Sequence, residues 1–320
     1  MHAPRSVITI GNFDGVHVGH AALVTRAAEL ARTVPGGARV VAMAFDPHPM
    51  TRLKPEAAPA RLTTFEQRVA LLRAAGADEV VKLEPRDEVL HLSPEEFVRT
   101  LLLPRGPAYV VEGSDFHFGK ARAGNVRVLG ALAASMGFAA DVVAPVEVAL
   151  TDHLIVTASS TVVRWLLSHG RVRDAAIVLG RPYEMQGVVT QGDQRGRTIG
   201  FPTANLASDQ MLPADGVYAA IASLPDGRDA LAAVNVGARP TFKGVQRRVE
   251  AHLFDAAGAP ALQVPAGYDW PLRLRFVGFV RDQVRFDSVD RLRAQLSRDI
   301  GRASVILHHS PAPASMNGAA

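Results

Sequence analysis

The order of strand-like and helix-like segments changes near residue 180, and this change constrains the fold more than any other feature of the sequence. Before it, short apolar segments such as SVITI (6–10) and EVVKL (79–83) alternate with helix-like segments. This alternation predicts a parallel sheet with helices on both faces. After LGRPY (179–183), strand-like segments follow one another across turn-rich connections, which predicts an antiparallel sheet or a small barrel. One amphipathic helix, at about 288–307, ends this second part.

We therefore expect two domains and a tail. Residues 1–180 are predicted to form an α/β domain with a Rossmann-like parallel sheet, and residues 181–308 an antiparallel β-barrel with a terminal helix. The small, polar and Pro-rich segment 309–320 is predicted to be disordered. Just before the domain boundary, a helical pattern over 159–179 is split into two pieces at Gly170.

Composition excludes several classes of protein. The chain has no cysteine, which rules out disulfides, thiolate metal sites and cysteine nucleophiles, and it fits a cytoplasmic location. We find no N-terminal signal segment and no apolar run of the roughly 18 residues that a membrane span needs. The net charge is only +4 and there is no long Lys/Arg run. We therefore expect neither a membrane nor a nucleic-acid partner; the small positive charge favours solubility or a mild attraction for phosphorylated small molecules. The oligomeric state is left open.

The stretch GNFDGVHVGH (11–20) lies where the first strand should end and the first helix begin. Ligands of parallel sheets bind at this edge, glycines let backbone approach them closely, and a helix start offers N–H groups to phosphate. His17 and His20 are one helical turn apart and would reach the same anion. Such a pair suits the stabilisation of negative charge during phosphoryl transfer.

Two other interpretations of the histidine pair stay open. Zinc binding is compatible with their spacing, but no third cluster of ligands is visible and the glycines would have no role. Alternatively, both histidines pack in the core. The glycine spacing matches neither the dinucleotide fingerprint nor the Walker A loop.

A second motif, GVVTQGDQRGRTIGFPTANL (187–206), follows the change of pattern. Its glycines at 192, 196 and 200, with the neighbouring arginines, could cover a nucleotide, or could simply form a hairpin turn. Thr203 and Asn205 are two residues apart and share one face if the segment is extended. Their oxygens are of the kind that binds magnesium together with substrate phosphates.

Four segments occur in a characteristic order: GNFDGVHVGH, FDPHP (45–49), GSDFHFGK (113–120) and SSTVVR (159–164). Together they resemble the HxGH-type nucleotidylyltransferase domain of the bacterial bifunctional riboflavin kinase/FAD synthetase family. The resemblance implies that His17 and His20 are catalytic and hold ATP phosphates, with the SSTVVR element closing over them. The ATP-binding residues that it implies are Gly11, Asn12, Phe13, His17, His20, Ser160, Thr161 and Arg164.

The resemblance also implies a flavin site on two loops of the first domain. Its candidate residues are Asp46, Pro47, His48, Pro49, Asp115 and Phe118. Phe116 or Phe118 is available to stack on the flavin ring, but core packing is an equal alternative for both rings.

The second motif resembles the riboflavin kinase module, with support from GVYAA (216–220), NVGARPTF (235–242) and VEAHLFD (249–255). The resemblance implies that Thr203 and Asn205 bind Mg²⁺ and that Glu250 is the general base for the riboflavin 5′-hydroxyl; alone, Glu250 would read as a solvated charge. The ATP-binding residues implied for the kinase are Gly192, Arg197, Gly200, Phe201 and Pro202. Two positions depart from the family pattern: Asp269 stands where glycine is usual, and Gln283 where glutamate is usual.

These features predict a bifunctional transferase with riboflavin, FMN and ATP as its small-molecule partners and Mg²⁺ as its cofactor. The barrel would phosphorylate riboflavin to FMN, and the α/β domain would adenylylate FMN to FAD with release of pyrophosphate. Two alternatives are an adenylyltransferase with an inactive kinase module and a flavin- or nucleotide-binding sensor without turnover.

Overall fold

The structure is a computed structural model that describes residues 5–192, 195–241, 244–255, 258–260, 265 and 267–309. The side chains of residues 195, 197, 239–241 and 244–246 lie outside this description, as does nearly all of the expected tail at 309–320. The chain divides into two compact units, Met1–Val148 with Val156–Ser160 and Ala149–Ile155 with Thr161–Ala320. The boundary expected between residues 180 and 181 stays a prediction, because compactness does not tell which segments act on their own.

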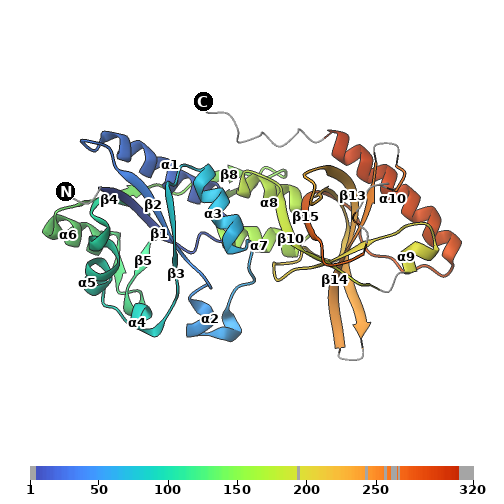
Figure 1. Cartoon of the computed structure of the whole chain (residues 1–320), viewed down its shortest axis with the longest axis horizontal. Coiled ribbons are helices and arrows are strands. Elements are labelled where there is room, and N and C mark those ends of the chain that lie inside the picture. The colour runs from blue at the N-terminus through green and yellow to red at the C-terminus, as the bar shows by residue number, and fades with distance from the viewer. Residues whose placement is uncertain are drawn as a thin grey trace. The chain divides into compact units, whose positions relative to one another are not determined.

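The first unit contains the predicted parallel sheet, in the order β3-β2-β1-β4-β7 (Figure 1). The chain fills one side of β1 with β2 and β3, and then returns to the other side with β4 and β7. The point where the direction reverses lies between β1 and β4, which is where open α/β sheets bind ligands. The five strands are β1 (Ser6–Gly11), β2 (Arg39–Phe45), β3 (Glu79–Leu83), β4 (Pro107–Gly113) and β7 (Ala139–Val143).

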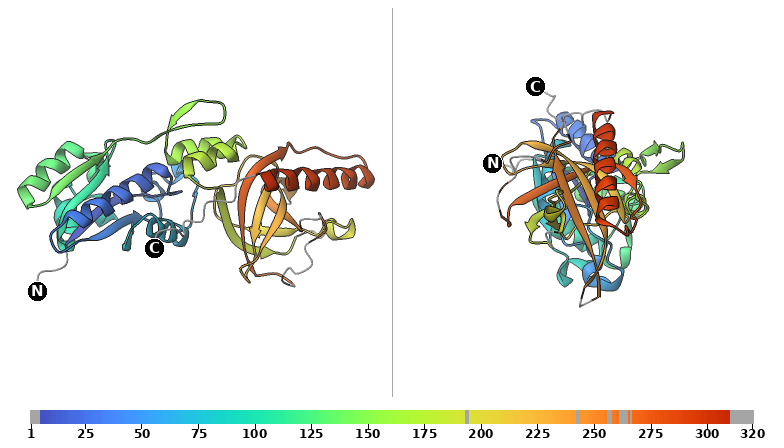
Figure 2. Two further views of the ribbon diagram at one scale, coloured as in Figure 1. Left: turned by 90° about the horizontal axis from the view of Figure 1, so that it is seen from above. Right: turned by 90° about the vertical axis from the view of Figure 1, so that its right-hand side faces the viewer.

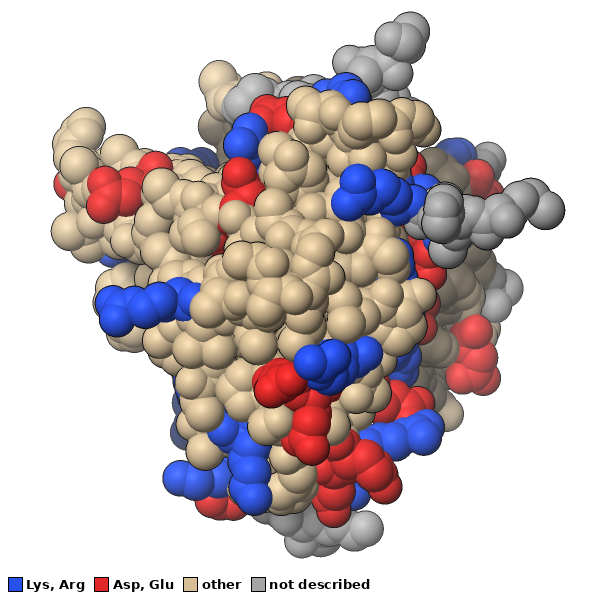
Figure 3. Space-filling model, turned by 90° about the vertical axis from the view of Figure 1, so that its left-hand side faces the viewer, with Lys and Arg blue, Asp and Glu red and all other residues tan. Residues whose placement is uncertain are grey.

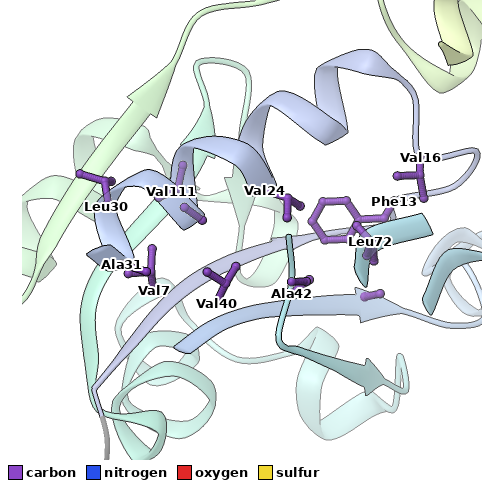
Figure 4. Close-up of a cluster of buried hydrophobic side chains, with 13 residues drawn as sticks. Val7, Phe13, Val16, Val24, Leu30, Ala31, Val40, Ala42, Leu72 and Val111 are labelled. Carbon is purple, nitrogen blue, oxygen red and sulfur yellow. The ribbon is translucent and has the colours of Figure 1, made fainter. Parts of the chain in front are cut away.

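Helices cover both faces of this sheet because its strands are apolar on both sides. One face packs against α1 and α3 through a buried cluster that includes Val24, Leu72 and Phe13 (Figure 4). The other face packs against α5, the π-helical turn Val98–Leu102 and α6. The helices of this part are α1 (Val18–Thr33), α2 (Met50–Leu53), α3 (Phe65–Ala74), α4 (Asp87–Leu90), α5 (Pro94–Phe97) and α6 (Val126–Met136). The shorter elements are the 3-10 turns Pro55–Ala57, Leu103–Arg105 and Lys120–Arg122 and the two-strand pairs β5 (His117–Phe118) with β6 (Gly124–Asn125) and β8 (Glu147–Ala149) with β9 (Ile155–Thr157).

Helix α5 begins with a capping box: the Ser93 hydroxyl accepts from the Glu96 N–H, and the Glu96 carboxylate accepts from the Ser93 N–H. The helix that it starts is not regular beyond Phe97, since it widens into the π-turn and ends in a 3-10 turn. Pro104, which has no N–H to donate, lies in that last turn, and Gly106 with φ of 60° ends it.

The second unit contains a closed antiparallel barrel in the order β10-β11-β14-β13-β12-β15, as expected. Strand β10 passes so close to β11 that a methyl group on Gly187 would overlap the Ala207 carbonyl. The strands are β10 (Tyr183–Thr190), β11 (Ala204–Ala207), β12 (Gly216–Ser223), β13 (Asp229–Thr241), β14 (Gly244–Phe254) and β15 (Pro271–Arg281).

Helix α10 (Val289–His309) lies along the outside of the barrel (Figure 2) and buries Ile300, Ala303 and Leu307 against it. Its Asp299 carboxylate accepts two hydrogen bonds from Arg281, at 2.9 and 2.7 Å, which join the helix to the end of β15. The remaining helices are α7 (Ser160–Ser168), α8 (Val172–Leu179) and the short α9 (Arg195–Thr198). Helices α7 and α8 are separated at Gly170, whose φ of 69° suits glycine, as predicted.

Within the described part of the chain, no helix is both long and apolar enough to cross a membrane. On the face shown in Figure 3, acidic and basic side chains are interspersed among uncharged residues.

Candidate active sites

The Asp14 side chain fixes the loop after β1 by hydrogen bonds to the segment at Leu62 and Thr63. Its buried carboxylate accepts hydrogen bonds from the N–H groups of Leu62 and Thr63, at 3.0 to 3.1 Å, and from the Thr63 hydroxyl at 3.1 Å. Phe13 and Val16 adopt positive φ angles of 47° and 40°, which side-chain-bearing residues rarely do. Both side chains are buried in the core, so packing holds the loop in a conformation that would otherwise be costly.

His17 and His20 meet at the start of α1, at the sheet edge that the sequence predicts. His17 is the N-cap of the helix, and its Nδ1 accepts from the His20 N–H at 3.4 Å. The two rings stack with their centroids 3.6 Å apart, and the ring of Phe13 lies edge-on to His20 at 5.1 Å. Gly19 lies against His17, since a methyl group there would come within 3.1 Å of the imidazole. The arrangement places two imidazoles at the N-terminus of the helix, where backbone N–H groups favour an anion.

The structure also bears on the two other interpretations of the histidine pair, metal binding and core packing. Among the residues that the structure describes, no group of three or more His, Cys, Asp and Glu could hold a metal ion. His17 is 6 % exposed and also caps the helix, so packing is part of its role, whereas His20 is only half-buried. Phe13 is fully buried, so any contact that it makes with a nucleotide would come from its backbone.

The loop after β2 joins the same site. His48 Nδ1 accepts from the Met50 N–H at 3.1 Å, and His48 Nε2 lies 3.1 Å from the side-chain amide of Asn12. The predicted ATP and flavin loops therefore touch at the carboxyl ends of β1 and β2. The Asp46–Pro47 peptide in this loop is cis, and Pro49 precedes α2 as its N-cap.

Asp46 is the centre of a buried ion-pair cluster that no sequence motif signals. Its carboxylate binds Arg68 directly, Arg61 at 3.0 Å and Lys82 at 2.9 Å. Burial opposes ionisation of Asp46, but the hydrogen bond from Lys82 and the charge of Arg68 hold its pKa below its usual range. Asp46 is thus an anion already neutralised by protein cations, which orders the loop that carries His48.

Arg68 connects this cluster to the backbone on both sides. Its guanidinium, on a residue only 3 % exposed, donates to the Asn12 carbonyl at 2.9 Å and to the Phe45 carbonyl at 2.8 Å. Nothing in the spacing of α3 signals this role, because an arginine in a helical pattern is normally solvated.

Glu112 is a second buried group that the sequence-based site predictions missed, although a lone carboxylate in the apolar run AYVVEG was a visible signal. The β1–β4 pairing runs only to Ile8 and Val110, and beyond it the Glu112 carboxyl accepts from the Ile10 N–H at 2.6 Å. Burial raises the pKa of Glu112 well above its usual range, and the nearby charge of Asp115 adds to this, against the lowering effect of the Ile10 hydrogen bond. The Glu112 carboxyl therefore fills the split between β1 and β4, where burial favours its neutral form.

We predict that Glu112→Gln stabilises the fold increasingly as the pH rises. The pKa of Glu112 is higher in the folded than in the unfolded protein. Its contribution to the free energy of unfolding is therefore fully present below the ordinary pKa of 4.5, and it is lost as the pH rises through the folded-state pKa. Glutamine keeps the oxygen that accepts from the Ile10 N–H but does not ionise. The free energy of unfolding of the variant should therefore exceed that of the wild type by about 1.4 kcal/mol more for each pH unit between the two pKa values. Denaturant unfolding of both proteins from about pH 5 to pH 8 measures it; a difference that does not change with pH contradicts a neutral Glu112.

The other flavin candidates divide between loop and core. Asp115 follows β4 and is exposed, whereas Phe118 is 5 % exposed and packs in the core. Phe116 is half-buried and stacks on Phe118, with ring centroids 5.4 Å apart. Of the two roles left open by the sequence, core packing is the one seen for Phe118, and Phe116 is the ring that remains partly accessible.

The SSTVVR element straddles the two compact units. Ser160 belongs to the first, where its hydroxyl donates to the Asp14 carbonyl at 2.7 Å, so it does reach the histidine loop. Thr161 and Arg164 lie on α7 in the second unit. Their approach to His17 and His20 stays a prediction.

The second site is a row of side chains across three barrel strands. Asn205 on β11 pairs directly with Glu250 on β14, and Glu250 pairs directly with Asn235 on β13. Directly paired residues in a sheet present their side chains on one face. Thr203 precedes β11 by one residue and is exposed. The register therefore places the predicted base beside one of the predicted metal ligands.

The amide of Asn205 has the properties of a ligand. Its Oδ1 is buried and has no hydrogen-bond partner in the structure, which is costly unless something else binds it. Gly192 lies so close that a methyl group would overlap this amide. An orphaned amide oxygen with a hydroxyl two residues away fits a hard divalent cation such as Mg²⁺.

We predict that Gly192→Ala slows riboflavin phosphorylation about tenfold or more, because its methyl group must push aside the Asn205 amide. The rate of FMN formation, measured against Mg²⁺ concentration, should show a raised requirement for the metal. The matched control is Gly301→Ala on α10, where a methyl group meets nothing within 4 Å. Equal rates in both variants would remove Gly192 from the site.

His252 lies beside this row and was not singled out from the sequence. Its Nδ1 bonds the Pro202 carbonyl at 2.8 Å and must be the donor, and its buried Nε2 has no partner in the structure. Burial lowers the pKa of His252, although the bond to Pro202 acts in the opposite direction. The ring of Phe201 lies edge-on to it at 5.5 Å, so Phe201 and Pro202 are anchored to β14.

The other kinase candidates lie on the connection between β10 and β11. Gly200 has φ of 86° and ends the short helix α9, while the side chain of Arg197 lies outside the described residues. Asp269, one of the two departures from the family pattern, has φ of 64°, a conformation that glycine adopts more easily. Gln283, the other departure, contacts Asn235 at 2.9 Å.

The fold and these two sites define a class: a two-module transferase in which one module is a nucleotide-binding α/β sheet and the other a barrel with oxygen ligands beside a carboxylate. Comparison with known proteins supports this class. Residues 1–156 match the family model of FAD synthetase, and residues 179–307 match that of riboflavin kinase. Ser160, Thr161 and Arg164 fall between the two matches.

The chain is 35 % identical over 299 residues to the bifunctional riboflavin kinase/FMN adenylyltransferase of Escherichia coli K12, which covers 92 % of this chain and 90 % of that protein. The corresponding protein of Haemophilus influenzae is 31 % identical over 303 residues, with 94 % of each chain covered. A crystal structure described as the macrolide-efflux protein of Streptococcus pneumoniae aligns with a TM-score of 0.82 and 30 % identity over 93 % of each chain. The chain belongs to the bifunctional riboflavin kinase/FMN adenylyltransferase family, as its motifs predict.

Proposed function

We propose that this protein makes FAD in two steps, one in each module, and that the residues of the two candidate sites carry them out. The barrel phosphorylates riboflavin with ATP to give FMN and ADP, and the α/β unit transfers the adenylyl group of a second ATP to FMN. The observation that carries the proposal furthest is the direct pairing of Glu250 with Asn205, whose amide oxygen is buried and unpartnered. A carboxylate base beside a metal ligand has a use in phosphoryl transfer, whereas binding alone needs no base.

In the barrel, Glu250 accepts the proton of the riboflavin 5′-hydroxyl as the hydroxyl oxygen bonds to the γ-phosphorus of ATP. The bond to the β,γ-bridging oxygen breaks, and ADP leaves. Thr203 and Asn205 would hold Mg²⁺, which supplies charge neutralisation to the phosphates. The connection carrying Gly192, Arg197, Gly200, Phe201 and Pro202 binds the ATP.

In the α/β unit, a phosphate oxygen of FMN attacks the α-phosphorus of ATP and pyrophosphate leaves. This attack needs no protein nucleophile, because the phosphate is already ionised, so positioning and charge stabilisation suffice. His17, His20 and the N-terminus of α1 meet the ATP phosphates, with Gly11 and Asn12 contributing backbone and amide contacts. Ser160, Thr161 and Arg164 complete the ATP site.

FMN binds on the neighbouring loops of the α/β unit. Asp46, Pro47, His48 and Pro49 form one side, and the contact between His48 and Asn12 supports this, since it brings the flavin loop to the ATP loop. Asp115 and the half-buried ring of Phe116 form the other side, with Phe118 packed behind them.

One time course tests the proposal. The purified protein is incubated with riboflavin, ATP and Mg²⁺, and riboflavin, FMN, FAD and pyrophosphate are resolved as the reaction proceeds. We expect FMN to appear first and FAD with equimolar pyrophosphate afterwards. FAD from added FMN but no FMN from riboflavin would indicate an inactive kinase module, and tight flavin binding without products would indicate a sensor.

We further propose a cytoplasmic location without nucleic-acid or membrane partners, which the cysteine-free sequence and the small net charge of +4 support.

A further inference from the structure

Gln283 lies between β15 and α10 and makes two hydrogen bonds to β13. Its Nε2 donates to Asn235 Oδ1 at 2.9 Å and to the Val236 carbonyl at 3.0 Å. Gly237, the residue after Val236, also lies against Gln283, since a methyl group on Gly237 would overlap the Gln283 amide. The amide is thus seated against three consecutive residues of the strand.

One of these residues, Asn235, belongs to the row of side chains that runs across β11, β14 and β13. Asn235 pairs directly with Glu250, which in turn pairs with Asn205. A residue that fixes the side chain of Asn235 therefore acts one strand away from the proposed base, Glu250, and two strands away from the proposed metal ligand, Asn205. Asn235 is half-buried, so a substrate can reach its side chain.

The two bonds require a hydrogen-bond donor at position 283, which the amide of Gln283 supplies. Asn235 Oδ1 and the Val236 carbonyl are both acceptors, and the NH₂ group of glutamine supplies one donor to each. A carboxylate has no donor for either of them. With its oxygen held by Gln283, the amide of Asn235 directs its own NH₂ group the other way.

We propose that Gln283 is a positioning residue for riboflavin phosphorylation: it orients Asn235 so that the Asn235 NH₂ group donates to an oxygen of the bound substrates beside Glu250. The acceptor is a substrate oxygen, either a hydroxyl or a phosphate oxygen. The proposal rests on the proposed kinase function of the barrel. It assigns a role in this chain to one of the two positions where the sequence departs from its family.

Three variants test it, each assayed for FMN formation from riboflavin and, separately, for FAD formation from FMN. Gln283→Met keeps the length of the side chain but removes both donors, and Gln283→Glu replaces the donors with acceptors. Gly237→Ala leaves Gln283 in the sequence but displaces its flexible end. We expect all three to lower kcat for riboflavin phosphorylation about threefold or more with KM for ATP unchanged, because hydrogen bonds of this kind are worth about that factor. FAD formation from FMN should be unchanged.

A double-mutant cycle with Asn235→Ala separates positioning from general stability. If Gln283 acts through Asn235, adding Gln283→Met to Asn235→Ala causes no further loss of kcat. Additive losses, or losses of kcat that simply follow a lowered unfolding midpoint in both activities, overturn the proposal. An inactive wild-type kinase would instead refute the function on which it rests, and the two failures are distinguished by the wild-type rate alone.

Discussion

His20→Ala is expected to reduce the formation of FAD from FMN about 10²- to 10³-fold while riboflavin is still phosphorylated at the wild-type rate. The loss follows from removing one of the two imidazoles that face the phosphates at the start of α1, where groups that stabilise developing charge have effects of this size. The measurement is the initial rate of pyrophosphate release with FMN and ATP, compared with the rate of FMN formation from riboflavin.

His20 is the better choice for this test than His17. His17 caps α1 through its Nδ1 and is almost fully buried, so its loss would combine a weaker helix start, worth about 1 kcal/mol, with the loss of chemistry. His91→Ala is the matched control: His91 is exposed, lies in the same unit, and its ring contacts the Asp87 carbonyl of the preceding helix α4 at 2.8 Å. If His91→Ala and His20→Ala had equal rates, the stacked pair would not be the adenylyl-transfer site.

Glu250→Gln is expected to have the opposite effect, a reduction of riboflavin phosphorylation by about 10²- to 10⁴-fold, the range for loss of a general base. Glutamine has nearly the same size, so the pairing of β14 with β11 and β13 should persist while the proton acceptor is lost. FAD formation from added FMN should remain at the wild-type rate. High-performance separation of the flavins over time measures both activities in one sample.

Glu184→Gln serves as the control for this variant, because Glu184 is a half-buried carboxylate on β10 of the same barrel but outside the row of Asn205, Glu250 and Asn235. A loss of both activities in a folded Glu250→Gln protein would show that the two reactions are not divided between the two units. A wild-type kinase rate would remove Glu250 as the base.

Much of the fold was predictable from local pattern. The parallel sheet follows from apolar strands that alternate with helices, and SVITI and EVVKL became β1 and β3 within a few residues. The helix predicted over 288–307 is α10. Local pattern was insufficient where one helix ends in an irregular turn after Phe97, because a π-turn has no distinct periodicity in sequence.

The candidate sites were predictable where motif and position coincide. The histidines at 17 and 20 follow glycines after the end of β1, and the candidate oxygen ligands at 203 and 205 lie around the start of β11, so each signal is contained in one short segment. Arg68 and His252 give no such signal, and the one that Glu112 gives, a lone carboxylate in an apolar run, does not show what the carboxyl binds. Their importance comes from what covers them: a guanidinium 3 % exposed, a carboxyl with a raised pKa and an imidazole nitrogen without a partner.

The sequence by itself determined the two-part architecture, the place of the candidate anion-binding loop after β1 and the family, because each depends on residues that are neighbours along the chain. Only the tertiary structure decided that Glu250 stands opposite Asn205, that His48 touches Asn12 and that Gln283 holds Asn235. The physical reason is that strand register and burial arise from contacts between segments far apart in the chain. A shift of one residue in the pairing of β11 with β14 would turn the proposed base away from the proposed metal ligand and leave every local pattern unchanged.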